Sequence, residues 1–120
     1  MKATLQPGIT GDARHVVTVE MSPAHLPRVV LSTPSMIGLI EQTCLASVED
    51  HLDEGETTVG THVCVSHQAA AFEGEEVVFR TRLSKIERRR LTFDVQVEGP
   101  RGLLSEGTHE RAVVLLDRMS

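Results

Sequence analysis

The segment from Thr33 to Leu52 has the strongest local pattern in the chain and predicts one long helix. Thr33 and Pro34 open it, with a hydroxyl residue in the capping position and a proline at the first helical position, where its missing N–H is harmless. Gly55 follows the expected end. Plotted at about 100° per residue, the helix has one broad apolar arc. Its members are Met36, Ile37, Ile40, Cys44, Leu45, Val48 and Leu52.

Five strands are expected around this helix. The segment from Arg14 to Glu20 precedes the helix and is rich in β-branched residues. Four later segments are expected to be strands: Thr58–Ala70, Glu76–Ile86, Leu91–Glu98 and Leu103–Asp117. Tight connections make the last three an antiparallel meander. The order predicts a single α+β domain over residues 1–120, in which one five-stranded sheet wraps the helix. Its exposed edges favour dimerisation through the sheet.

The composition excludes several classes of function. Lys and Arg number 12 against 17 Asp and Glu, a net charge of −5, and aromatic residues are only 2% of the chain. A nucleic-acid partner would require basic surface or stacking rings, and the chain offers little of either. No stretch approaches the ~20 apolar residues of a membrane span, and the first residues lack the apolar run of a signal peptide. We therefore expect a cytoplasmic protein that binds neither nucleic acid nor membrane.

The cysteines and histidines do not form a metal-binding pattern. Cys44 and Cys64 each lie within a regular apolar pattern, so we expect both to be reduced and buried. The six histidines are scattered, and no zinc-type spacing occurs. We expect no metal and no cofactor.

Glu41 and His67 are the first candidates for chemistry. Glu41 interrupts the apolar arc of the helix, where a desolvated carboxylate could act as an acid, a base or a nucleophile. An ion pair with one arginine, or a helix rotated enough to expose the carboxylate, would explain it equally well. His67 ends the apolar face of the segment after the helix and could move a proton near neutral pH. A core histidine bonded to a backbone carbonyl is the alternative.

Thr33 and the run Arg88–Arg90 also have two interpretations each. Thr33 is a helix cap whose hydroxyl also lies where a helix N-terminus favours negative charge. It precedes Glu41 by eight residues, about 12 Å along the axis, so the two cannot touch within one chain. His67 or a second copy would have to complete a shared site. Arg88–Arg90 could bind a phosphorylated ligand or form a solvated turn.

Three motifs occur in order along the chain. They are TPSMIGLIE from Thr33 to Glu41, TVGTHVCVSH from Thr58 to His67 and GTHERAVV from Gly107 to Val114. Together they resemble the hotdog-fold thioesterases related to fluoroacetyl-CoA thioesterase. The resemblance implies a hotdog fold, a homodimer with its active site at the dimer interface, and hydrolysis of acyl-CoA thioesters. Association of two dimers into a tetramer stays open.

The resemblance also implies roles for five residues. Thr33, Glu41 and His67 match the catalytic threonine, glutamate and histidine of the family. Gly60 matches a glycine close to the bound thioester. Arg111 matches the arginine of the third motif, for which a structural ion pair and a substrate contact are both open. A general-base route and an acyl-enzyme route are equally compatible with the sequence.

The segment from Ser22 to Ser32 departs from the family pattern. Fluoroacetyl-CoA thioesterase carries a Phe-containing lid before its catalytic threonine, whereas this segment has no aromatic residue. We therefore expect thioesterase activity on a small or medium acyl-CoA, without fluoroacetyl selectivity. The alternatives are a non-catalytic binder of acyl-CoA or small hydrophobic ligands and a hotdog enoyl-CoA hydratase. A hydratase would require an aspartate that the apolar arc lacks.

Overall fold

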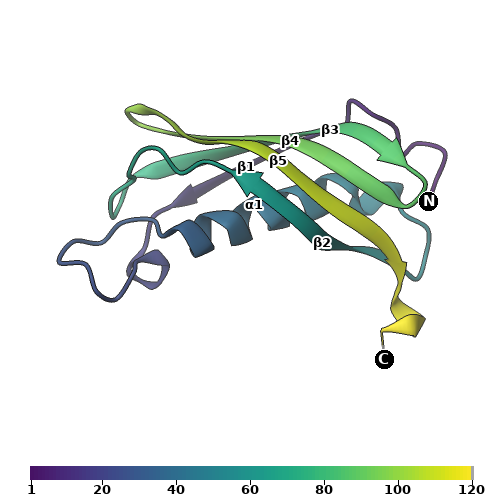
Figure 1. Cartoon of the computed structure of the whole chain (residues 1–120), viewed down its shortest axis with the longest axis horizontal. Helices are drawn as coiled ribbons and strands as arrows, with labels where there is room; N and C mark the ends of the chain where they lie inside the picture. Colours follow the sequence, from purple (N-terminus) through teal and green to yellow (C-terminus); the bar gives the residue numbers. More distant parts are fainter. Residues whose placement is uncertain (120) are drawn as a thin grey trace.

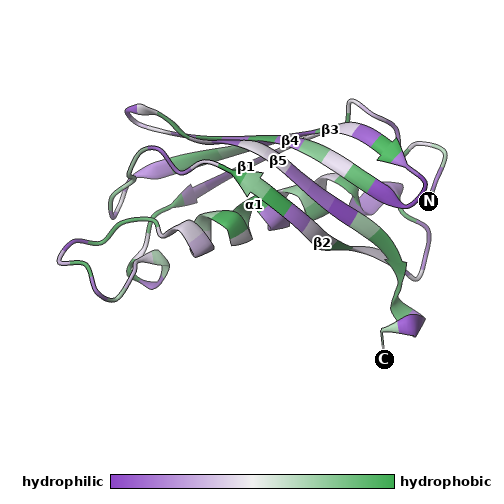
Figure 2. Cartoon of the chain, in the orientation of Figure 1, coloured by the Kyte–Doolittle hydropathy of each residue, from purple (hydrophilic) through white to green (hydrophobic). Residues whose placement is uncertain are grey.

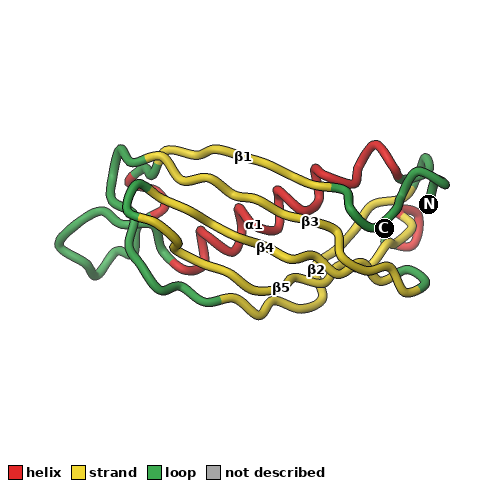
Figure 3. Tube along the Cα trace, turned by 90° about the horizontal axis from the view of Figure 1, so that it is seen from above, coloured by secondary structure: helices red, strands yellow, loops and turns green. Residues whose placement is uncertain are grey.

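A computed structural model describes residues 1–119 of the chain. Its main elements are β1 (Thr10–Val16), α1 (Thr33–Val48), β2 (Glu56–Val65), β3 (Glu76–Glu87), β4 (Arg90–Gly99) and β5 (Gly102–Leu115). The strands form one antiparallel sheet in the order β1-β3-β4-β5-β2, which curves over α1 (Figure 1). Seen from above, α1 runs beneath the strands (Figure 3). The α+β arrangement predicted from the sequence is confirmed.

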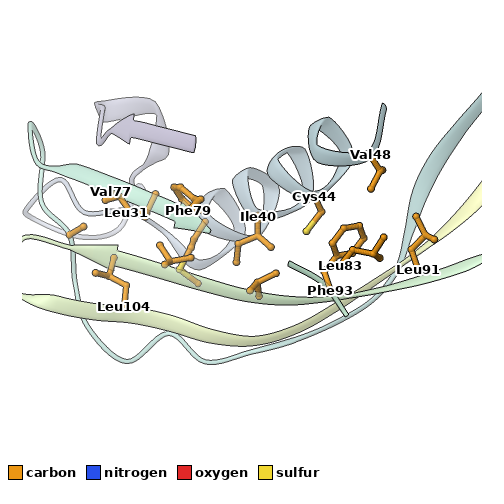
Figure 4. Packing of buried hydrophobic residues seen from close by; sticks show 14 of the residues in the cluster. Leu31, Ile40, Cys44, Val48, Val77, Phe79, Leu83, Leu91, Phe93 and Leu104 are labelled. Carbon is orange, nitrogen blue, oxygen red and sulfur yellow. The ribbon is translucent and has the colours of Figure 1, made fainter. Parts of the chain in front are cut away.

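The core lies between α1 and the face of the sheet that is turned toward it. The fully buried side chains of the helix are Met36, Ile40, Cys44 and Val48. Phe79, Leu83 and Phe93 of β3 and β4 belong to the same cluster (Figure 4). Figure 2 shows hydrophobic and hydrophilic residues alternating along these strands, as a sheet with one covered face requires. Within residues 1–119, no helix is long and apolar enough to cross a membrane.

Several element boundaries differ from the prediction. The first strand is β1 at Thr10–Val16 rather than Arg14–Glu20, because the chain leaves the sheet after Val17 and forms the 3-10 turn η1 (Val19–Met21). Helix α1 ends at Val48 and its expected last turn is the 3-10 turn η2 (Glu49–His51). The strand expected to reach Ala70 ends at Val65. A third short turn, η3 (Leu116–Arg118), follows β5.

The predicted face of the second strand is also wrong in part. The pairing of β2 with β5 is shifted between Gly60 and His62, which leaves Thr61 as an extra residue. A bulge reverses which residues face the helix. Thr58 is buried before it, while Cys64, expected to be buried, is exposed after it. Both cysteines are free thiols, and burial raises the pKa of Cys44 to about 12.

Candidate active site

Ser32, and not Thr33, caps helix α1. Its backbone is extended and its hydroxyl accepts a hydrogen bond from the Ser35 N–H at 3.2 Å. The predicted cap is one residue too late. Proline is tolerated at any of the first helical positions, because their N–H groups have no partner within the helix, so Pro34 does not determine which residue is the cap. Thr33 is therefore the first helical residue, and its hydroxyl has no capping role. It lies 2.7 Å from Nδ1 of His67.

Backbone pairing brings His67 to the start of the helix. The segment before α1 runs alongside the segment after β2, where Val30 forms an isolated antiparallel bridge with Phe72. The Leu31 N–H donates to the Ala71 carbonyl at 2.9 Å. Partial burial lowers the pKa of His67, opposed by a hydrogen bond with the Ala69 backbone. The imidazole is therefore neutral at pH 7, where it can take up a proton.

A cavity of about 340 Å³ adjoins His67. Its walls are Val30, Leu31, His67, Gln68, Ala69 and Ala70. A larger hollow of about 720 Å³ lies instead among exposed residues of the outer sheet face, such as Arg80, Arg82 and Asp94, and none of the predicted site residues lines it. We place the candidate site at the smaller cavity because His67 lines it and the Thr33 hydroxyl contacts His67.

Glu41 lies in the middle of α1 with its carboxylate toward β2. The side chain is 40% exposed, so the desolvated carboxylate expected from the apolar arc is not found within one chain. The reason is Gly60 of β2, which has no side chain to cover it. A Cβ atom at Gly60 would lie 3.1 Å from Oε2 of Glu41.

Arg111 of β5 is the partner of Glu41. Its guanidinium is buried, with Nη1 at 3.7 Å from Oε2 of Glu41. Nε donates to the Thr58 hydroxyl at 2.7 Å, and Nη2 donates to the Thr58 carbonyl at 2.9 Å. Burial lowers the pKa of Arg111, an effect that Glu41 opposes, and arginine keeps its charge in proteins. Of the two roles left open for Arg111, this geometry supports the ion pair.

His109 is a polar residue of the site that sequence reasoning missed. Its ring is fully buried, with Nδ1 at 2.7 Å from the His62 carbonyl and Nε2 at 3.1 Å from Nη1 of Arg111. The alternation of buried and less buried residues along β5 could have indicated that His109 is buried. His109 and Arg111 share their side of the strand with the buried Val113, so both had to face the interior.

The site therefore consists of two polar groups. Thr33 and His67 form the first, and Glu41, Arg111 and His109 form the second around Gly60. No hydrogen bond or ion pair within the described part of the chain joins the two groups. This agrees with the expectation that Thr33 and Glu41 cannot touch within one chain.

The arginine run at the turn between β3 and β4 lies outside both groups. Arg89 is bonded to Glu56 at 3.0 Å and to the Val113 carbonyl at 3.0 Å. Arg88 adopts a left-handed conformation with φ of 58° at the turn itself. The contacts of Arg89 hold the turn against β2 and β5. They favour the interpretation of Arg88–Arg90 as a turn over the binding of a phosphorylated ligand.

Comparison with known proteins assigns the family. Residues 12–117 match the family described as fluoroacetyl-CoA-specific thioesterase. The chain belongs to this family. The fluoroacetyl-CoA thioesterase of Streptantibioticus cattleyicolor is 35% identical over 107 residues, which cover 89% of this chain and 76% of that protein.

Solved structures confirm the fold. A mutant of fluoroacetyl-CoA-specific thioesterase, crystallised with fluoroacetate and CoA, is 30% identical and superposes with a TM-score of 0.91, covering 97% of this chain and all of that one (100%). A hot-dog-like protein from Thermanaerovibrio acidaminovorans, 24% identical, superposes with a TM-score of 0.87 over 94% of this chain and 86% of its own. The protein is therefore a thioesterase with the predicted hotdog fold. The family favours this activity over the non-catalytic binder and the hydratase.

Proposed function

We propose that this thioesterase hydrolyses a small or medium acyl-CoA at a site formed between two copies of the chain, with Thr33, Glu41 and His67 as catalytic residues. The observation that carries the proposal is the contact of 2.7 Å between the Thr33 hydroxyl and Nδ1 of His67, beside a cavity. A hydroxyl held against a neutral imidazole can donate a hydrogen bond and pass on a proton. The relative solved with fluoroacetate and CoA supports the substrate class.

Each group has a task in the reaction. Hydrolysis breaks the bond between the carbonyl carbon and the CoA sulfur, adds water at that carbon and delivers a proton to the sulfur. Glu41 takes the proton of the attacking water, or attacks the carbonyl and forms an anhydride that water then opens. The Thr33–His67 pair donates a hydrogen bond to the departing sulfur, and the proton that the sulfur finally carries comes from the water consumed in the reaction. The Gly60 backbone stabilises the oxyanion at a position that no side chain blocks.

A second copy of the chain completes this site. β2 is an edge strand, so its outer N–H and C=O groups have no ladder partner in the sheet. The half-exposed Glu41 lies beside this edge and is separated from the Thr33–His67 pair of its own chain. Pairing of two β2 edges would cover the edge and enclose the carboxylate. The cytoplasmic location and the single-domain organisation stay predictions.

The test is thiol release from acetyl-, fluoroacetyl-, butyryl- and hexanoyl-CoA. We expect Glu41→Gln and His67→Ala each to lower kcat by about 100-fold or more, which is the usual contribution of acid–base catalysis. Gln42→Ala is the control, because Gln42 is exposed and adjoins Glu41 in the chain. Without an aromatic lid, the rates for fluoroacetyl- and acetyl-CoA should be similar.

Two outcomes would overturn the proposal. One is full activity in both variants. The other is thermal stabilisation of the wild-type protein by acyl-CoA without thiol release. A single turnover in ¹⁸O-water identifies an anhydride that water opens at the Glu41 carbonyl, because only that route places the label in the Glu41 carboxylate.

A further inference from the structure

Two contacts of His109 fix which of its ring nitrogens carries the hydrogen. The His62 carbonyl can only accept, so Nδ1 at 2.7 Å must be the donor. The Arg111 guanidinium can only donate, so Nε2 at 3.1 Å must be the acceptor. Both contacts are satisfied by one form alone, the neutral imidazole with its hydrogen on Nδ1.

We propose that His109 is a positioning residue of the thioesterase, whose neutral ring accepts a hydrogen bond from Arg111 and thereby holds the guanidinium beside Glu41. The inference rests on the proposed function only in assigning Glu41 to catalysis. The His109 side chain is fully buried. It acts through Arg111.

The donors of Arg111 show why an acceptor is needed at this point. Nε and Nη2 are bonded to Thr58, which fixes one side of the guanidinium. Nη1 is shared between Nε2 of His109 and the Glu41 carboxylate, at 3.1 and 3.7 Å. Without the His109 acceptor, one N–H of a buried charged group would lose its partner, and Nη1 would be free to move relative to Glu41.

The surroundings of His109 favour the neutral ring. Burial is the largest cause that lowers its pKa, and the positive charge of Arg111 acts in the same direction. The His62 carbonyl and the carboxylates of Glu41 and Glu110 oppose this effect. The Phe93 ring of β4 stacks on the imidazole, with centroids 6.4 Å apart, and contributes no charge. A proton on Nε2 would point at Arg111 and break the contact.

Two substitutions distinguish the effect of losing the hydrogen-bond acceptor from the effect of losing the buried ring. His109→Phe keeps a buried ring and removes both nitrogens, whereas His109→Gln restores an acceptor oxygen near the position of Nε2. We expect kcat to fall about 10- to 100-fold in His109→Phe, as is typical of lost supporting contacts, with little change in KM. His109→Gln should recover most of the activity. Ser105→Ala is the matched control on the same buried face of β5, because the Ser105 hydroxyl has no hydrogen-bond partner within residues 1–119.

A double variant tests whether His109 acts through Glu41. If it does, adding His109→Phe to Glu41→Gln lowers kcat no further than Glu41→Gln alone. Multiplicative losses in the double variant would overturn the positioning role. Equal losses in His109→Phe and His109→Gln would do the same, because the acceptor would then be irrelevant.

Nitrogen NMR of the histidine rings gives a measurement that does not depend on activity. In the folded wild-type protein at pH 7, His109 should show a protonated Nδ1 and an unprotonated Nε2. A cationic ring or the opposite tautomer would overturn the inference even if the enzyme is active. Conversely, full activity in both Glu41→Gln and His67→Ala would refute the proposed function while leaving the tautomer result intact. If His109→Phe fails to fold, the NMR spectrum of the wild-type protein and the activity of His109→Gln still test the inference.

Discussion

Gly60 illustrates how much a single missing side chain contributes to the site. A Cβ atom there would lie 3.1 Å from Oε2 of Glu41, 3.2 Å from Cε1 of His109 and 3.5 Å from Nη1 of Arg111. The first two distances are shorter than ordinary van der Waals contacts, so the groups would have to move by a few tenths of an ångström. Gly60 therefore leaves room for these groups.

Gly60→Ala should impair activity more than stability. We expect a fall in kcat of about tenfold, because small displacements of a reacting group are costly, and a change in the free energy of unfolding below about 1 kcal/mol. Steady-state kinetics and urea unfolding measure the two effects. Gly38→Ala is the matched control, since its added Cβ meets no atom within 4 Å apart from its chain neighbours and the nearby backbone of its own helix, and alanine should stabilise the helix by about 0.5–1 kcal/mol. Unchanged kcat in Gly60→Ala would refute the crowding argument.

At the level of elements, two neighbouring residues at the start of α1 make different contacts: Ser32 caps the helix, and Thr33 contacts His67. Ser32 caps the helix, so Ser32→Ala should lower the free energy of unfolding by about 1 kcal/mol. Thr33→Val has no cap to remove and should leave stability nearly unchanged, yet it abolishes the contact with His67 and should lower kcat strongly. Urea unfolding and thiol release, measured on both variants, check this division. A larger loss of stability in Thr33→Val than in Ser32→Ala would show that Thr33 is the cap after all.

The same elements show what the sequence could and could not predict. The helix, the meander and the candidates Glu41 and His67 followed from periodicity, because burial leaves a regular pattern. The helix cap did not follow from the sequence, since Ser32 and Thr33 are adjacent, both carry a hydroxyl and both lie just before Pro34. The bulge at Thr61 also escaped, because β-branched residues continue on either side of it and hide the change of face. The alternation of β5 places His109 in the interior, but its contact with the His62 carbonyl depends on the pairing of β2 with β5, which no local pattern contains.

At the scale of the whole molecule, the separation of the two polar groups has a geometric origin. Thr33 and Glu41 lie on one rigid helix, about 12 Å apart along its axis, and no bending of the sheet can change this. The Thr33–His67 pair belongs to the end of the helix, whereas Glu41 belongs to its centre. The proposed dimer requires the centre of one helix to lie beside the end of the other, an arrangement that a twofold axis repeats at both sites.

Mixed dimers test whether one site uses residues of both copies. Chains carrying Glu41→Gln and His67→Ala, co-expressed with different tags and purified as the mixed dimer, should regain about half of the wild-type activity, because one of two sites is then intact. In that site the Thr33–His67 pair comes from one chain and Glu41 from the other. The mixed dimer of Thr33→Ala and His67→Ala is the control and should stay inactive, since these residues touch within one chain and every site carries a defect. No recovery in the first mixture, with dimer formation verified by sedimentation, would show that each chain supplies its own glutamate.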